Sequence, residues 1–348
     1  MTESGRFGAP GLFPRRPTEY ASAGKIANLD ALATVTLSRV VGGGADGCRA
    51  VDLRVAGGVD VRILPDRGFD LGAAWFRGVP LPWISAVGET APVDEPNGGT
   101  WIRTFGGGLV TTCGLRNVGV PSEGHGQHGR FSHLRASDVR TDRSVEDGEV
   151  VVTAGATIDE VDVHGAHLRV ERTVRTRTGT GLVELTDVTT NLGHRAEAAP
   201  LLYHVNVGTP LLDEGARIAI ASDEVLPRDP NAERGLGSWM AAGPPEPGAR
   251  EMVFEHRISP DAYGWAAASV VNASLGFAFG LRWRRAELPR FHQWIHPDRG
   301  MYVVGLEPAN CSVRGRAVDR AAGVLPIMEP GEVRTTELRI VVTRVAPD

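Results

Sequence analysis

Short runs of hydrophobic and β-branched residues, separated by turn residues, recur along almost the whole chain. Few windows place apolar residues at i, i+3, i+4 and i+7 without an intervening Gly or Pro, so little helix is predicted. The runs have the length and composition of β-strands. The predicted strands cover residues 33–41, 50–55, 59–64, 149–156, 167–177, 182–190, 217–221, 269–282, 301–306 and 335–343. The regular return of strands and turns predicts an all-β protein, a sandwich or a barrel.

The strands at 167–177 and 182–190 are joined by Thr178-Gly179-Thr180-Gly181, whose glycines can supply the positive φ that a tight turn needs. This spacing predicts a hairpin and, more widely, a meandering antiparallel topology. The segment 227–250 is rich in Pro, Gly and Ala, but the strands on both sides of it have the same character. We therefore expect a long surface loop there, and one sandwich domain over residues 31–348 after an N-terminal extension of residues 1–30.

Composition changes this picture little. The 348 residues are 42% hydrophobic and 23% charged, with a formal net charge of −5 and no basic stripe, which argues against a nucleic-acid partner. The N-terminus has no apolar signal region, and no run of about 18 apolar residues occurs, so we expect a cytoplasmic protein without a membrane partner. Cys48, Cys113 and Cys311 lack CxxC spacing, which argues against a disulfide framework or a thiolate metal site.

The densest polar cluster contains His125 and His128, both flanked by glycines. A loop of this kind can bring imidazoles close to a ligand. The alternative is a solvent-exposed turn whose histidines have no function.

A second polar feature is the strand-like run from Leu201 to Gly208. Its alternation places His204 and Asn206 on one face and Tyr203 on the other. If the first face is packed, both side chains need partners, because an unpaired buried polar group is costly. A lone His in a strand is otherwise more often structural.

A third feature is Glu307, which ends an apolar strand directly before Pro308. A glutamate there is either an edge-strand charge or a functional group. Together with the two histidine segments it supplies a candidate general base and two candidate acids, the groups needed to move protons between two oxygens.

The three segments, in this order, resemble motifs of the aldose 1-epimerase (galactose mutarotase) superfamily. The runs that carry the resemblance are Gln127-His128-Gly129-Arg130, Tyr203-His204-Val205-Asn206-Val207-Gly208 and Gly305-Leu306-Glu307-Pro308. The segments 65–72 and 328–332 are similar to an uncharacterised branch of that superfamily. The resemblance implies a large antiparallel β-sandwich, a sugar or sugar derivative as ligand, a monomer or homodimer, and an isomerase that needs no metal and no other cofactor.

The resemblance also implies a role for each residue. Glu307 would take the proton of the anomeric hydroxyl, His204 would protonate the ring oxygen, and His128 would hydrogen-bond the ring oxygen or a nearby hydroxyl. Arg67 would orient the sugar, unless it forms a salt bridge with Asp66 or Asp70. Gln293 and Trp294 would contact the sugar's hydroxyls and apolar face, although Trp294 could equally belong to the core. The substrate-binding candidates are Arg67, His125, Asn206, Gln293, Trp294 and Arg130.

Several alternatives stay open at this point. The superfamily also places an aspartate on the sugar, for which Asp213, Asp223 and Asp229 are candidates without a matching motif. An anionic sugar would need cations, which Arg67, Arg116 and Arg130 could supply. The chain could also be a non-catalytic sugar-binding protein of the same fold. A metal-dependent isomerase or lyase is the third alternative, because His125 and His128, and again His164 and His167, have ligand-like spacing.

Overall fold

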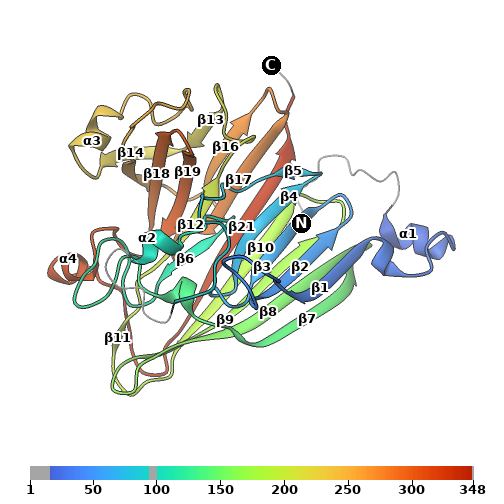
Figure 1. Ribbon diagram of the computed structural model, residues 1–348, viewed down its shortest axis with the longest axis horizontal. Coiled ribbons are helices and arrows are strands. Elements are labelled where there is room, and N and C mark those ends of the chain that lie inside the picture. The colour runs from blue at the N-terminus through green and yellow to red at the C-terminus, as the bar shows by residue number, and fades with distance from the viewer. Residues whose placement is uncertain (1–15, 94–99, 347–348) are drawn as a thin grey trace.

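A computed structural model describes residues 16–93 and 100–346 of the chain. The predicted all-β class is confirmed, because the described strands form four antiparallel sheets and the helices are few and short (Figure 1). The helices are short: α1 (Pro17–Ser22), α2 (Thr100–Thr104), α3 (Pro230–Arg234) and α4 (Arg316–Ala321), with 3-10 turns at Leu29–Ala31 and Phe131–His133. Among the described residues, no helix has the length and apolar character to span a membrane.

The largest sheet has eight strands in the order β13-β16-β17-β21-β10-β9-β8-β7. Its strands are β7 (Ser137–Glu146), β8 (Glu149–Val161), β9 (His167–Arg177), β10 (Leu182–Asn191), β13 (Arg217–Ile220), β16 (Trp265–Asn272), β17 (Phe277–Arg284) and β21 (Val333–Arg344). Strands β7 to β10 form the expected meander, including the hairpin at Gly179. The meander then ends, because the C-terminal strand β21 inserts between β10 and β17.

A five-stranded sheet packs on β8 and β9 of this large sheet. Its strands follow in sequence order: β1 (Ala33–Arg39), β2 (Arg49–Val55), β3 (Val59–Leu64), β4 (Asp70–Phe76) and β5 (Val79–Pro80). Of the expected N-terminal extension, residues 1–15 lie outside the described residues. Within the rest, α1 lies beside the β7–β8 turn, where Thr18 donates its backbone N–H and its hydroxyl to the carbonyl of Gly148.

A six-stranded sheet has the order β14-β15-β18-β19-β12-β6. Its strands are β6 (Thr111–Gly114), β12 (Leu201–Val207), β14 (Ser222–Pro227), β15 (Met252–Ile258), β18 (Arg290–Asp298) and β19 (Met301–Ala309), and a small sheet pairs β11 (Glu197–Ala198) with β20 (Ile327–Met328). The loop expected between β14 and β15 is present and largely exposed, with α3 as its one helix.

One predicted strand was wrong. Residues 269–282 form the ends of two strands, β16 and β17, which pair with each other around a turn at Gly276. Asn272 accepts the backbone N–H of Leu275 at 2.9 Å and so closes that turn. The apolar residues on both sides concealed the break.

A buried ion-pair network joins the three large sheets. Arg172 on β9 is fully buried, and its guanidinium lies 2.7 Å from Asp70 of β4 and 2.6 Å from Asp187 of β10. The hydroxyl of Tyr203, on β12, donates to Asp187 at 2.6 Å. Because each charge has a partner, the network fixes the position of β12 against the large sheet.

Candidate active site

Strand β12 presents His204 and Asn206 on one face and Tyr203 on the other, as its alternation predicts. The Tyr203 face meets the large sheet, and the His204 face lies on the opposite side of the six-stranded sheet. His204 is 5% exposed and Asn206 is fully buried, so this second face is packed rather than open to solvent.

Strand β19 brings Glu307 to the same face, because Asn206 pairs with Gly305 and Gly305 is two residues from Glu307. Nε2 of His204 lies 3.1 Å from Oε1 of Glu307. The two groups are not aligned for a hydrogen bond. Glu307 Oε1 is therefore buried without a hydrogen-bond partner, and so are His204 Nδ1 and Asn206 Oδ1 on the same face.

Three unpartnered polar atoms on one face are unusual, since a buried polar group without a partner costs about 1–3 kcal/mol. A hydroxyl-rich ligand would satisfy them. This face of the six-stranded sheet is therefore the candidate site.

Aromatic rings surround the His–Glu pair. Phe105, directly after α2, and Trp294 on β18 each lie 5.2 Å from the ring of His204, edge to face. Trp101 of α2 lies 4.5 Å from Phe105 and 4.5 Å from the ring of His128. These rings present flat apolar surfaces of the kind that contact the C–H faces of sugars.

His128 approaches from the loop after β6. Its ring lies 6.3 Å from that of His204. The residue has a φ of 56°, which is rare for a residue with a side chain and indicates that the loop is held in a specific conformation. Gly129, which follows, packs against the backbone of Gly114, where an added Cβ would lie 2.4 Å from the carbonyl oxygen.

The protonation of the cluster follows from its burial. Burial raises the pKa of Glu307 to about 8, the charge of Glu251 adds to the rise, and Arg228 opposes it. Burial lowers the pKa of His204 to about 4, against the effects of the Asn206 amide and Glu251. Burial, with His204 beside it, lowers the pKa of His128 to about 3. Near neutral pH the His204–Glu307 pair therefore holds one proton, which resides on the carboxyl, and the pair has no net charge.

Sequence reasoning missed a carboxylate beside this cluster. Glu251, directly before β15, accepts the indole N–H of Trp294 at 2.9 Å and lies 2.9 Å from NH2 of Arg228. It is the mid-chain carboxylate that acts electrostatically on both His204 and Glu307. No motif marks it in the sequence, because its place in the site depends on the pairing of β15 with β18.

The three aspartates considered for this region have other contacts. Asp229 caps α3 by accepting the N–H groups of Asn231 and Ala232, and it pairs with Arg228. Asp223 accepts the hydroxyl of Ser259, and Asp213 is exposed.

Two predicted substrate-binding residues are directed away from the cluster. Gln293 lies on the opposite face of β18, because adjacent strand residues alternate, and its amide bonds to His256 and to the carbonyl of Trp239, both at 3.0 Å. Arg67 donates to the carbonyls of Ser132, Thr90 and Thr104. Its guanidinium therefore holds the segment around α2 in place and has no salt bridge with Asp66 or Asp70, which pair with Arg49 and Arg172.

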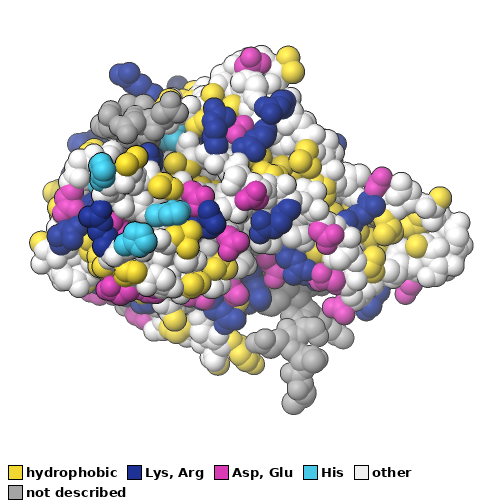
Figure 2. Space-filling model, turned by 90° about the horizontal axis from the view of Figure 1, so that it is seen from below, with side chains coloured by type: hydrophobic (Ala, Val, Ile, Leu, Met, Phe, Trp, Pro, Cys, Tyr) yellow, Lys and Arg dark blue, Asp and Glu magenta, His cyan; other side chains and the backbone are white. Residues whose placement is uncertain are grey.

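The remaining cations also have partners. Arg130 contacts Glu160 at 2.6 Å and Asp162 at 3.2 Å, and Arg116 contacts Glu197 at 2.6 Å. Burial, together with Arg316 and Arg116, lowers the pKa of His125 to about 4, so its ring is neutral. Figure 2 shows basic and acidic side chains interspersed over one face of the molecule, without a field of one sign.

Within the part of the chain that the structure describes, no three His, Cys, Asp or Glu side chains gather in a metal-binding arrangement. The second histidine pair is split: His164 is exposed, and His167 Nε2 lies 3.9 Å from Asp159.

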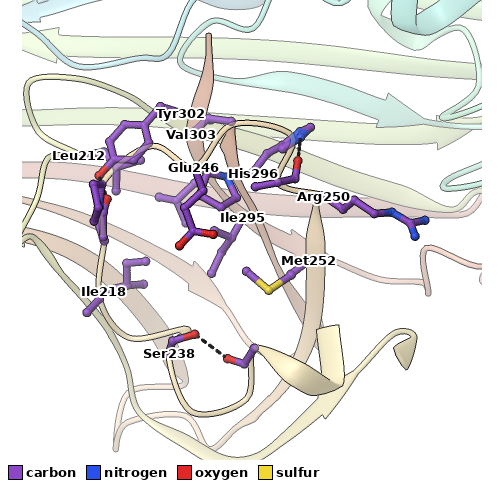
Figure 3. Close-up of a pocket in the computed structure, with 18 of the residues that line it drawn as sticks. Leu212, Ile218, Ser238, Glu246, Arg250, Met252, Ile295, His296, Tyr302 and Val303 are labelled. Atoms are coloured by element: carbon purple, nitrogen blue, oxygen red, sulfur yellow. Dashed lines mark hydrogen bonds between the residues drawn. The ribbon is translucent and has the colours of Figure 1, made fainter. Parts of the chain in front are cut away.

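A separate cavity of about 480 Å³ lies under the loop between β14 and β15 (Figure 3). Its floor is apolar, with Leu212, Ile218, Met252 and Ile295, and the Tyr302 ring forms a wall, fixed by its hydroxyl donating to Gly243. His204, Glu307 and His128 do not line it.

The fold defines the class of the protein: it is the galactose mutarotase-like β-sandwich. The solved structure of a Klebsiella pneumoniae protein, provisionally named an aldose 1-epimerase, superimposes with a TM-score of 0.84 at 24% identity, over 89% of this chain and 83% of that one. A galactose mutarotase-like protein from Clostridium acetobutylicum gives a TM-score of 0.61 at 12% identity, over 90% and 100%. Galactose 1-epimerase from Lactobacillus acidophilus gives 0.56 at 13% identity, over 90% and 99%.

Within this class, the chain belongs to the family described as a domain of unknown function, DUF4432, which matches residues 45–342. No curated protein is similar to it in sequence. At these identities the solved structures establish the fold, and the chemistry has to be argued from the site itself.

Proposed function

We propose that the protein interconverts the two anomers of a sugar, as an aldose 1-epimerase does. The observation that carries this proposal is the His204–Glu307 pair: a buried imidazole and a buried carboxyl whose Nε2 and Oε1 atoms lie 3.1 Å apart, and whose Nδ1 and Oε1 atoms have no hydrogen-bond partner. Reversible opening of a sugar ring needs one group that takes a proton from the anomeric hydroxyl and another that gives a proton to the ring oxygen.

In the proposed reaction, Glu307 takes the proton from the anomeric hydroxyl while the bond between the anomeric carbon and the ring oxygen breaks. The electrons of that bond go to the ring oxygen, which receives a proton from His204, and the anomeric carbon becomes an aldehyde. Rotation of the aldehyde and the reverse proton transfers close the ring to the other anomer. Because the raised pKa of Glu307 and the lowered pKa of His204 place the resting proton on the carboxyl, the reaction starts from the form of the pair in which Glu307 is ionised and His204 is protonated.

His128 has a supporting role in this proposal. Its pKa of about 3 keeps the ring neutral, so it can donate one hydrogen bond to a sugar oxygen without adding a positive charge. Trp294 and Phe105 would pack on the apolar face of the sugar. Electrons and protons balance within the sugar and the pair, so the proposed reaction contains no redox step.

Exchange NMR on a panel of neutral and acidic aldoses tests the proposal. We expect faster transfer of magnetisation between the α and β anomeric protons of at least one sugar with the wild-type protein, and loss of that acceleration with Glu307→Gln. Binding of a sugar without faster exchange of its anomers would support the non-catalytic alternative. If anomer exchange is faster for no sugar of the panel, the proposed enzymatic activity is rejected.

A further inference from the structure

The Arg228–Glu251–Trp294 chain of contacts leads from the surface to the His–Glu pair. Arg228 follows β14 and pairs with Glu251 at 2.9 Å, and Glu251 accepts the Trp294 indole N–H at 2.9 Å. The indole ring lies 5.2 Å from the ring of His204, and the Cβ of Trp294 would lie 3.2 Å from a Cβ added to Gly305. The wall of the site is thus held by a charged group behind it.

We propose that Glu251 is a positioning residue: its carboxylate holds the Trp294 indole against His204, and its negative charge, which Arg228 limits, acts on Glu307 from behind this wall of the site. This inference rests on the proposed function for its consequence in catalysis, but the interactions themselves can be measured without it.

The other titratable groups near the pair do not carry a competing charge. His204 and His128 are neutral near pH 7, and burial lowers the pKa of His292 on β18. Burial raises the pKa of Cys113, on β6, well above its usual value, so the thiol is neutral as well. Glu251 and Arg228 are therefore the charged groups that act on Glu307 from the residues described around it.

Substitutions can separate two effects of Glu251, its hydrogen bond to the indole and its negative charge. Glu251→Gln keeps an oxygen that can accept the indole N–H and removes the charge, whereas Glu251→Ala removes both. Arg228→Gln leaves the carboxylate and removes the opposing positive charge. Because the side chain of Glu251 is about 44% exposed, solvent screens its charge. We therefore expect each charge-removing variant to shift the ionisation of Glu307 by on the order of 0.5 pH unit.

The expected result has a sign that a purely structural role would not produce. Glu251→Gln should move the ionisation of Glu307 to lower pH, and Arg228→Gln should move it to higher pH. The maximal anomerisation rate should stay within about threefold in Glu251→Gln and fall about tenfold in Glu251→Ala, because only the second frees the indole.

Glu255→Gln is the matched control: Glu255 is on β15, which begins directly after Glu251, and is also paired with an arginine, Arg290, at 2.7 Å. Infrared titration of the Glu307 carboxyl band, assigned with Glu307→Gln, measures the ionisation directly, and the pH profile of anomerisation measures its effect. The inference would be overturned if Glu251→Gln and Arg228→Gln moved the ionisation of Glu307 in the same direction. It would also be overturned if Glu255→Gln moved that ionisation as far as Glu251→Gln does, or if Glu251→Gln and Glu251→Ala had equal maximal rates. An inactive wild type with the expected infrared shifts would instead reject the proposed function and leave the placement of Glu251 intact.

Discussion

A Cβ atom on Gly305 would lie 2.7 Å from Oε1 of Glu307, so β19 has room for this carboxylate because residue 305 has no side chain. The same Cβ would lie 3.2 Å from Cε1 of His204 and from Cβ of Trp294. Gly305 thus shapes the space between the three side chains of the site.

We predict that Gly305→Ala displaces Glu307 and lowers the anomerisation rate by about 100-fold, since a misplacement of about 1 Å at the reacting groups has effects of this size. Gly280→Ala is the control, because a Cβ on this strand glycine makes only a 3.5 Å contact. Initial rates by polarimetry, with circular dichroism to confirm folding, check the prediction. Equal rates in both variants would show that the space beside Gly305 is not needed.

The raised pKa of Glu307 predicts a pH-dependent cost in stability. Between pH 4.5, the ordinary value, and pH 8, the unfolded chain releases the Glu307 proton and the folded chain retains it, so the free energy of unfolding falls as pH rises. Glu307→Gln removes this loss. We expect the free energy of unfolding of the variant to exceed that of the wild type by a few kcal/mol at pH 9 and by much less at pH 5, as measured by urea unfolding. A stability difference that is the same at both pH values would contradict the buried, proton-holding carboxyl.

The lowered pKa of His128 predicts a loss of stability at low pH, in contrast to the loss at high pH that Glu307 predicts. Its folded pKa of about 3 lies below the ordinary 6.5, so the unfolded chain takes up a proton first, and stability is lost as pH falls from about 6.5 toward 3. Asparagine tolerates the positive φ of this position. The free energy of unfolding of His128→Asn should therefore fall by about 1.4 kcal/mol less per pH unit than that of the wild type across this range. Exposed His164 provides the control: His164→Asn should change the free energy of unfolding by no more than about 0.5 kcal/mol. Parallel curves for wild type and His128→Asn would show that the ring is not buried neutral.

The network behind β12 predicts a stability effect rather than a catalytic one. Tyr203→Phe removes a hydroxyl that lies 2.6 Å from both Asp187 and Thr336, and it should lower the free energy of unfolding by about 1–3 kcal/mol. Tyr263, which is 68% exposed, provides the control Tyr263→Phe, for which we expect a change within about 0.5 kcal/mol. Calorimetry measures both variants, and equal melting temperatures would contradict the role given to Tyr203.

Local alternation predicted the part of the site that lies on single strands. The placement of His204 and Asn206 on one face of β12 follows from the twofold period of a strand. The same rule shows why Gln293 and Trp294 could not both face the His204–Glu307 pair, since neighbours on a strand point to opposite faces. The interval 269–282 was too long for an ordinary strand, which was a sign of the hairpin that it contains.

Other parts of the site depend on contacts between distant segments. Trp101 lies in a short helix with no periodic pattern and Phe105 directly follows it, and Glu251 reaches Trp294 only because β15 pairs with β18. Arg67 lies in a motif that resembles a sugar-orienting turn, but its donors are used by backbone carbonyls. Such roles depend on which partners the fold supplies, and sequence spacing does not contain that information.

The central claim is that the His204–Glu307 pair moves protons on a sugar. The most direct measurement is the exchange rate between anomers of the best sugar from the panel, with wild type, Glu307→Gln and His204→Gln at equal concentration, and with circular dichroism to confirm that all three are folded. The account predicts acceleration by the wild type and a loss of 100-fold or more in each variant. Wild-type rates in both folded variants would contradict it.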